Sequence, residues 1–150
     1  MSELYDDDTV RWSEHQAELL RRRAAGELVN DDELDWLNIA EEIESLGKSD
    51  ARELASRITT ILIHLIKLRA SAAVEPRAGW LATILEQRDQ IELLLKDSPS
   101  LRQKVPGLVD GRLVKARERA VAEMAAHADK PVVDVTTLAF TPEQVLFDAP

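Results

Sequence analysis

The sequence contains no cysteine among its 150 residues, and it has little glycine and few aromatic residues. Without cysteine there can be no disulfide, no thiolate nucleophile and no zinc site of the cysteine type. Five glycines are too few for the glycine-rich loops that cradle phosphates or dinucleotides. Aromatic residues make up only 4% of the chain, so aliphatic side chains must fill most of the core. The lack of cysteine also fits the reducing conditions of a cytoplasm, which is the setting we expect.

Long apolar runs are also missing. The longest one, Ile61–Ile66, includes a histidine and is far shorter than the roughly 20 residues that a membrane span needs. The chain starts with an acidic stretch, whereas a secretory signal starts basic and then becomes apolar. We therefore expect no membrane association.

The net charge of −9 is unevenly distributed along the chain. Residues 1–50 contain 15 acidic and 5 basic side chains, whereas residues 51–150 contain 13 acidic and 14 basic ones. An acidic surface repels phosphate backbones, so we expect no nucleic-acid partner.

Hydrophobic periodicity predicts an all-α fold: one helical-bundle domain over 1–150, with a main bundle over about 8–129 and a short C-terminal extension over 130–150. Asp8 is a natural N-cap for the first helix, and Gly26 and Gly47 are natural stops for the first two. A break is expected at Pro106-Gly107. The pattern predicts five helices, over residues 9–25, 33–46, 50–72, 80–96 and 108–128.

The apolar positions also predict which helix faces are buried. The 50–72 helix is apolar nearly all round, which is typical of a central helix or a subunit contact. Each of the other helices has a predicted apolar stripe. The stripes are Val10, Ser13, Ala17, Leu20 and Ala24 in the 9–25 helix; Trp36, Ile39, Ala40, Ile43 and Leu46 in the 33–46 helix; Trp80, Ile84, Ile91, Leu94 and Leu95 in the 80–96 helix; and Val114, Val121, Met124, Ala125 and Ala128 in the 108–128 helix.

The last 20 residues follow a different pattern. Residues 132–135 are rich in valine and are predicted to be extended. Thr141, Pro142 and Gln144 form a good helix start, with a threonine cap, proline first and glutamine third. We expect one closing turn there, with Val145, Leu146 and Phe147 packing back on the bundle.

Polar residues on apolar faces are the candidates for a functional site. Gln87 and Arg88 fall within the inner arc of their helix, and His64 interrupts the longest apolar run. Glu44 flanks the predicted core face of its helix, one turn after Glu41. Because buried charges need partners, we expect Glu44, His64 and Arg88 to contact one another. Such contacts would form either a structural network or a ligand or metal site, unless some of these groups are simply exposed.

Carboxylates and a histidine projecting into a helical bundle can bind a metal, which makes Glu41, Glu44 and His64 candidate ligands for a divalent ion. The Glu-x-x-His spacing of di-iron bundles is absent, so a dinuclear iron site is not expected. Helical nucleotide pyrophosphatases hold magnesium with Glu-x-x-Glu and Glu-x-x-Asp patterns, which 41–44 and 86–89 match. Glu86 and Asp89, however, fall on the side of their helix away from its apolar face. No cofactor is predicted, and a divalent metal remains the alternative.

Several short motifs together resemble the bacterial Domain of Unknown Function 29 family. They lie at residues 4–6 with Trp12, 39–47, 64–67, 80–84 with Gln87-Arg88, 97–101 and 141–146. The sequence departs from the family at Leu68, where an aromatic residue usually follows the lysine. The resemblance implies an all-helical fold and a bacterial, cytoplasmic setting, and it implies no activity. It also marks as recurrent the positions Glu44, His64, Lys67, Trp80 and Arg88.

Two functional hypotheses follow. The first is a non-enzymatic interaction or assembly module that binds a protein partner or itself, with apolar contacts from Trp12, Leu19, Ile63 and Ile66. The second is a metal-dependent hydrolase of a phosphorylated or nucleotide substrate. In that hypothesis Glu41, Glu44 and His64 hold the cation and Arg88 binds the anionic substrate.

Overall fold

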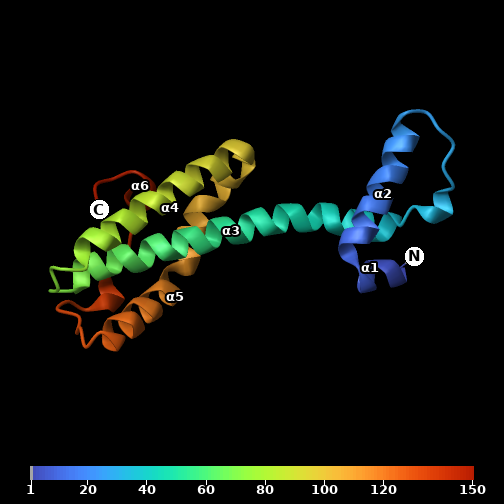
Figure 1. The fold of residues 1–150 in the computed structure, drawn as a ribbon. Helices are drawn as coiled ribbons and strands as arrows, with labels where there is room; N and C mark the ends of the chain where they lie inside the picture. The colour runs from blue at the N-terminus through green and yellow to red at the C-terminus, as the bar shows by residue number, and fades with distance from the viewer. Residues whose placement is uncertain (1) are drawn as a thin grey trace. The chain divides into compact units, whose positions relative to one another are not determined.

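The computed structural model describes residues 2–150, which contain helices and turns but no strand (Figure 1). The prediction of an all-α fold is therefore confirmed. None of the described helices is long and apolar enough to cross a membrane. The α-helices are α1 (Ser2–Asp7), α2 (Thr9–Ala24), α3 (Trp36–Ala70), α4 (Arg77–Asp97), α5 (Val105–Ala126) and α6 (Pro142–Leu146), and the 3-10 helices are η1 (Asp31–Glu33), η2 (Pro99–Lys104) and η3 (Val135–Thr137).

The chain divides into two compact units, residues 1–49 and residues 50–150, each of which is described by itself. The N-terminal unit contains α1, α2, η1 and the start of α3. The C-terminal unit contains the rest of α3 and everything after it, including the predicted extension over 130–150. That the whole chain folds as one domain stays a prediction.

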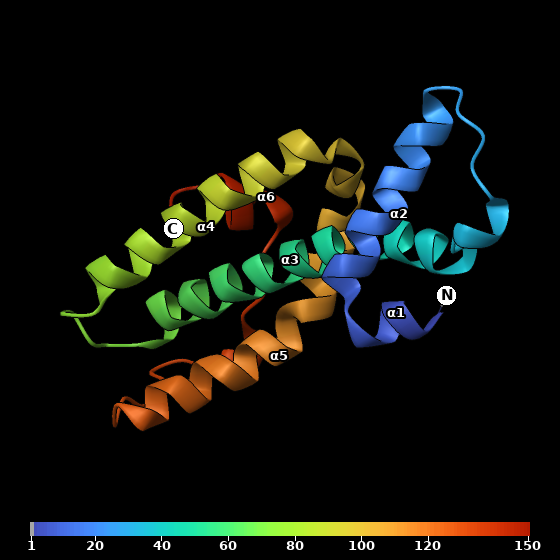
Figure 2. The ribbon, with the colours of Figure 1, turned by 45° about the vertical axis from the view of Figure 1, so that its right-hand side comes forward.

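In the N-terminal unit, α2 buries a different face from the one predicted. Asp8 caps the helix by accepting the N–H of Arg11 at 2.9 Å, as expected. The buried residues, however, are Trp12, Gln16 and Leu19, whereas Val10 is exposed. This face is the buried one because Trp12 and Leu19 offer more apolar area than the mostly small residues of the predicted stripe. Figure 2 shows α1 and α2 with the loop that leads from α2 to α3.

Gln16 is a buried polar side chain that fixes the start of α3. Its amide nitrogen donates to the carbonyl of Glu33 at 3.1 Å, and its amide oxygen accepts the N–H of Asp35 at 2.8 Å. The indole nitrogen of Trp12 donates to the carboxylate of Asp35 at 3.0 Å. The side chains of α2 thereby satisfy main-chain groups at the end of η1 and just before α3.

The predicted helix end at Gly47 is wrong, because α3 runs without interruption from Trp36 to Ala70. Gly47 does not adopt a positive φ, whereas Gly26, after the end of α2, has φ +84°. A glycine in a helix interior costs only about 1 kcal/mol relative to alanine, which flanking turns of helix can outweigh. The helix begins at Trp36 and not at Glu33, since residues 31–33 form η1 with Asn30 as its cap.

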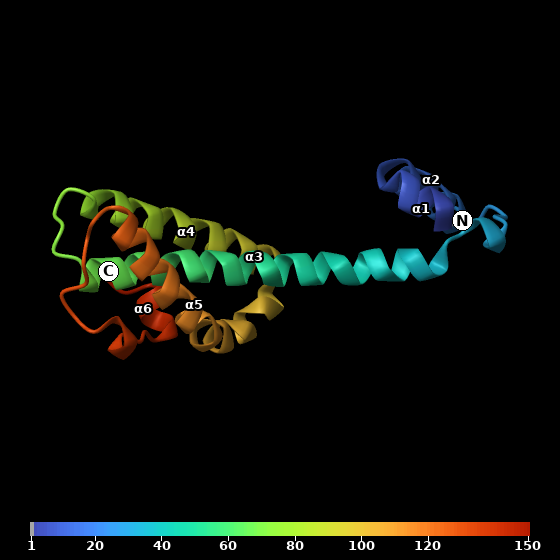
Figure 3. The same cartoon turned by 90° about the horizontal axis from the view of Figure 1, so that it is seen from below.

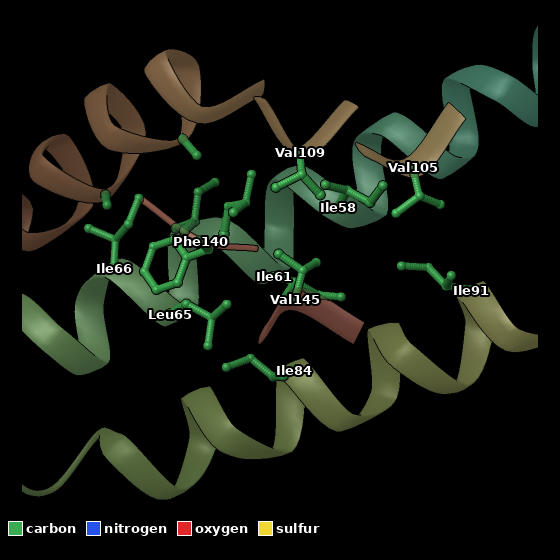
Figure 4. Close-up of a cluster of buried hydrophobic side chains, with 14 of the residues drawn as sticks. Ile58, Ile61, Leu65, Ile66, Ile84, Ile91, Val105, Val109, Phe140 and Val145 are labelled. Atoms are coloured by element: carbon green, nitrogen blue, oxygen red, sulfur yellow. The ribbon is translucent and has the colours of Figure 1, made fainter. Parts of the chain in front are cut away.

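The core of the C-terminal unit is built around α3, which is buried nearly all round in its C-terminal part, as the apolar pattern of residues 50–72 predicts. Figure 4 shows its side chains meeting those of α4 and α5 and those of Phe140 and Val145 from the C-terminal segment. Ile63 and Ile66, on the other side of the helix, are buried as well. The helix is therefore central. The buried stripe consists of Leu54, Ile58, Ile61, Leu62, Leu65 and Leu68.

The helices around α3 differ from prediction in their boundaries and, for α5, in their buried face. α4 starts at Arg77, and Ile84, Ile91, Leu94 and Leu95 of its predicted face are buried. α5 starts at Val105, because Pro106 lies in the first turn, where a missing N–H costs nothing. Met124 of the predicted stripe is buried, but Val114, Val121, Ala125 and Ala128 are exposed. α5 instead buries Val105, Val109, Ala116 and Ala120 beside Met124. Alanines at the contact let helices approach closely, which favours this face.

The C-terminal segment packs back on the C-terminal unit, as predicted (Figure 3). Residues 135–137 form η3, so the predicted extended stretch is wrong there. Thr141 and Gln144 form the predicted capping box at the start of α6. Val145 is fully buried, but Phe147 is exposed and does not pack as expected.

Gly47→Ala tests the continuity of α3. An added Cβ would meet no atom within 4 Å, so we expect the free energy of unfolding to rise by about 0.5–1 kcal/mol. Gly26→Ala is the matched control, because its positive φ should make alanine destabilising by about 1 kcal/mol. Urea denaturation followed by circular dichroism measures both. A destabilising Gly47→Ala would mean that the helix ends at this glycine.

Candidate functional site

Lys67 is a buried basic residue in the apolar part of α3, with 8% of its surface exposed. Its ammonium nitrogen lies 2.5 Å from a carboxylate oxygen of Glu123 on α5. The other carboxylate oxygen of Glu123 lies 3.4 Å from the guanidinium of Arg119, one turn earlier on α5. A buried ammonium needs such a partner, so the position of Lys67 ties α3 to α5.

Trp80, at the start of α4, is the second partner of Lys67. The ammonium nitrogen lies 5.6 Å from the centroid of the indole ring, within the range of a cation–π interaction. One side chain of α3 thus contacts both neighbouring long helices. The recurrent positions Lys67 and Trp80 belong to one cluster.

His64 lies one turn before Lys67 and is half-buried. Its Nδ1 is 2.7 Å from the carbonyl oxygen of Thr60, so Nδ1 carries the proton that it donates there. Burial lowers the pKa of His64, and the charge of Lys67 lowers it further, while the Thr60 hydrogen bond and Glu123 oppose these effects. His64 is therefore neutral at neutral pH.

The carboxylate of Glu123 remains ionised. Burial tends to raise the pKa of Glu123, but the hydrogen bond and charge of Lys67, helped by Arg119 and His64, bring it below its usual value of 4.5. Lys67 and Glu123 therefore form a charged pair at neutral pH.

A cavity of about 510 Å³ opens beside this pair. Lys67, Trp80 and Glu123 line it together with Glu75, which precedes α4, and Asp129, which follows α5. The Ser71 hydroxyl donates to the carboxylate of Asp129 and accepts the N–H of Ala73 at 3.0 Å. The apolar parts of the lining come from Ala73, Pro76 and Met124.

Gln87 and Arg88, also predicted site residues, lie elsewhere on α4, and both have structural partners on other parts of the chain. The Gln87 amide oxygen accepts from Arg57 at 3.0 Å. The guanidinium of Arg88 donates to three main-chain carbonyls, those of Gln144, Val145 and Asp148, each at 2.9 Å. Burial lowers the pKa of Arg88, but the group stays charged. Arg88 therefore holds the C-terminal segment on α4.

Glu41 and Glu44 are exposed on the part of α3 that belongs to the N-terminal unit. Glu44 lies 4.0 Å from Lys48, and both side chains are well exposed. Such a surface pair contributes little, roughly 0–1 kcal/mol. The neighbouring Glu42, which the sequence did not single out, accepts the hydroxyl of Tyr5 at 2.5 Å.

The predicted contacts among Glu44, His64 and Arg88 are wrong, since each has a different partner: Lys48, the Thr60 carbonyl and the C-terminal carbonyls. The helical wheel places residues on faces but cannot say which face meets which neighbour. Among residues 2–150, no three histidine, aspartate or glutamate side chains are grouped closely enough to hold a metal ion.

Sequence reasoning missed Glu123, Glu75 and Asp129. Glu123 adjoins the buried Met124 on α5. A lysine in the apolar part of α3 needs an acidic partner, and a glutamate next to a core residue of another helix is a candidate, so the sequence did contain a usable signal. The predicted α5 face was displaced from the observed one, which hid this pairing. Glu75 and Asp129 lie outside helices, where periodicity carries no information.

A second surface lies on the N-terminal unit. We call it the 36–47 face; it contains Trp36, Ile39, Ala40, Ile43, Leu46 and Gly47, which span an arc of roughly 120° at 100° per residue. The prediction that this arc is core is wrong, because Trp36, Ile43 and Leu46 are 49%, 64% and 70% exposed. The physical reason is that Tyr5 of α1 and Trp12 of α2 bond elsewhere, to Glu42 and to Asp35 just before α3. On the face itself, the Arg23 guanidinium of α2 lies 5.9 Å from the centroid of the Trp36 ring.

The apolar contact surface predicted from Trp12, Leu19, Ile63 and Ile66 does not exist, since all four side chains are buried within this chain. Trp12 packs edge-on against Tyr5 of α1 and bonds to Asp35, and Leu19 is buried on the same face of α2. The two isoleucines are core residues of the C-terminal unit. Among the described residues, the 36–47 face combines three large apolar side chains of one helix that are about half exposed or more in a continuous arc.

Comparison with known proteins confirms the predicted resemblance. The family described as "Domain of unknown function DUF29" matches residues 4–148, nearly the whole chain. No curated protein and no solved structure matches the sequence.

Lowering the pH should destabilise the protein through His64. Its folded-state pKa is depressed below about 6.5, so its contribution to stability is present above that pH and is lost as the pH falls toward the folded-state pKa, because unfolding then takes up a proton. We expect urea midpoints to fall between pH 7.5 and pH 5.5, and to fall less in His64→Gln. His15→Gln, at an exposed histidine of α2, should keep the wild-type pH dependence. Equal pH dependence in all three proteins would contradict the assignment.

Arg88→Leu should release the C-terminal segment. Losing hydrogen bonds from a charged donor to three carbonyls should cost about 1.5–3 kcal/mol. Amide hydrogen exchange in residues 141–148 should accelerate, while the core of α3 stays protected. Arg52→Leu, at an exposed arginine of α3 away from the C-terminal segment, is the control and should leave this exchange unchanged. Unchanged exchange in Arg88→Leu would show that Val145 alone holds the segment.

Proposed function

The chain belongs to the DUF29 family, and we propose that it is a non-enzymatic interaction module whose N-terminal unit binds a positively charged, amphipathic helix of a protein partner. The observation that carries this proposal is the exposed 36–47 face. Three of its four large side chains, those of Trp36, Ile43 and Leu46, are about half exposed or more. An exposed apolar arc of this kind can bind the apolar face of an amphipathic helix that lies along it.

Charge selects the partner. Residues 1–49 contain 14 acidic and 5 basic side chains, a balance of −9, whereas residues 50–150 contain 14 of each. The N-terminal unit therefore carries the whole net charge. Glu44 lies beside the apolar arc, at roughly 80° on the helical wheel with Trp36 at zero, whereas Glu41, at roughly 140°, lies on the opposite side of the helix. A partner helix with lysines or arginines next to its apolar stripe would pair with Glu44.

The same charge disfavours three other partners. Two copies of the chain would bring two units of −9 together, which opposes self-association through this face. Phosphate backbones and anionic lipid would be repelled for the same reason. The proposed setting is a bacterial cytoplasm, which the lack of cysteine permits.

The hydrolase alternative lacks a comparable observation. Arg88, its proposed substrate-binding residue, is occupied by main-chain carbonyls. Glu41 and Glu44 are solvated carboxylates, and Glu44 pairs only with Lys48 across 4.0 Å.

The proposal is tested with a synthetic helical peptide that has leucines at i, i+3, i+4 and i+7 and lysines elsewhere. Fluorescence anisotropy of the labelled peptide should show binding to the full chain, weakening as salt rises. Replacing two exposed apolar residues in Ile43→Ser/Leu46→Ser should weaken binding at least about tenfold. A peptide of the same composition in scrambled order should bind much more weakly.

Leu93→Ser/Val114→Ser is the matched control, since both residues are also exposed but lie in the C-terminal unit. It should bind the peptide like the wild type. Equal weakening by both double variants would overturn the proposal. So would a wild-type dimer in sedimentation velocity that Ile43→Ser/Leu46→Ser converts to a monomer, because the face would then serve self-association.

A further inference from the structure

The cavity beside Lys67 is the second place where the structure offers a binding site. Its volume of about 510 Å³ lies within the usual range for small-molecule sites, about 300–1,000 Å³. It lies wholly within the C-terminal unit, so its argument is independent of the 36–47 face.

The charges that line this cavity favour a cation. The Lys67 ammonium is neutralised by Glu123 at 2.5 Å. Glu75 and Asp129 add two further carboxylates, so the lining keeps an excess of negative charge even when a positive charge on His127, which also lines the cavity, is counted. An anion would lose its hydration and meet these carboxylates, while the only lysine of the lining is already paired.

The shape of the ligand follows from the uncharged part of the lining. Trp80 offers an aromatic surface, and Ala73, Pro76 and Met124 offer aliphatic contacts. Aromatic faces attract cations, as the ammonium of Lys67 over the Trp80 ring already illustrates. A ligand with a cationic head and a short apolar stem would use both parts of the lining.

The Asp129 carboxylate is held in place before any ligand arrives. The Ser71 hydroxyl donates to one of its oxygens, and Ser71 is itself buried and anchored by the N–H of Ala73. A carboxylate fixed in this way loses little freedom on binding a cation.

We propose that the cavity lined by Lys67, Trp80, Glu75, Glu123 and Asp129 binds a primary alkyl ammonium group, with the ammonium at Glu75 and Asp129 and its carbon chain against Trp80 and Met124. The group comes either from a free amine or from a lysine side chain. A lysine side chain ends in the same primary ammonium group as a free alkyl amine. The two sources must therefore be distinguished by experiment.

Isothermal titration calorimetry of the full chain at low salt tests this with three probes: n-butylamine, Nα-acetyl-lysine methylamide and butane-1-sulfonate. We expect at least one amine to bind and the sulfonate not to bind. Binding of butylamine alone identifies free amines as the ligand class, and binding of the lysine derivative alone identifies a side chain. Failure of both amines, or preference for the sulfonate, overturns the proposal.

Matched variants locate the site. Glu75→Gln should weaken amine binding about threefold, as expected for a partly exposed charge pair. Glu86→Gln, at an exposed glutamate of α4 outside the cavity, should not change it. Trp80→Leu should weaken binding about fivefold through the lost aromatic face. Equal effects of Glu75→Gln and Glu86→Gln would show that the amine binds by general charge attraction. Ile43→Ser/Leu46→Ser should leave amine binding intact, so this proposal and the proposed function fail separately.

Discussion

The C-terminal half of α3 must be covered on every side, and the rest of the C-terminal unit is arranged to do so. Residues 61–63 point in directions 100° apart, and all three are buried. No single neighbouring helix can cover such a surface. α4 and α5 cover part of it, and Phe140 and Val145 of the C-terminal segment complete the core. This explains why Arg88 and Arg117 both direct their guanidinium groups to main-chain carbonyls of that segment, which has little regular structure of its own.

The presence of a lysine inside this apolar segment imposes a second set of contacts. Lys67 requires a carboxylate, which Glu123 supplies, and its ammonium also lies over Trp80. The pair then affects its surroundings, because its charges act on His64 in opposite directions while burial keeps that imidazole neutral. The contacts that link α3 to α4 and α5 at this point therefore follow from one buried charge.

Local signals in the sequence predicted their structures well, and signals that depend on distant residues did not. The caps at Asp8 and Thr141 were predictable because each bonds to a residue within one turn. The continuation of α3 through Gly47 could not be predicted, since the contacts on either side of a glycine decide whether it ends a helix. Lys67 was identified as a site residue, but its partner Glu123 was not, because helix periodicity fixes directions and not neighbours. The all-round apolar character of the middle of α3 was sufficient to predict its central place.

Apolar spacing continues through the whole of α3, yet only its C-terminal half is covered, so periodicity alone does not decide burial. Burial also requires a partner surface, and in the N-terminal unit Tyr5 of α1 and Trp12 of α2 bond to polar side chains, those of Glu42 on α3 and Asp35 just before it. The charges at the cavity and on the N-terminal unit are not explained by a gain in stability. A buried pair such as Lys67 with Glu123 is often no more stabilising than an apolar pair of similar volume. A charge of −9 on 49 residues opposes compaction. Charge of this kind is more useful for selecting what binds: a basic helix at the 36–47 face and an ammonium group at the cavity.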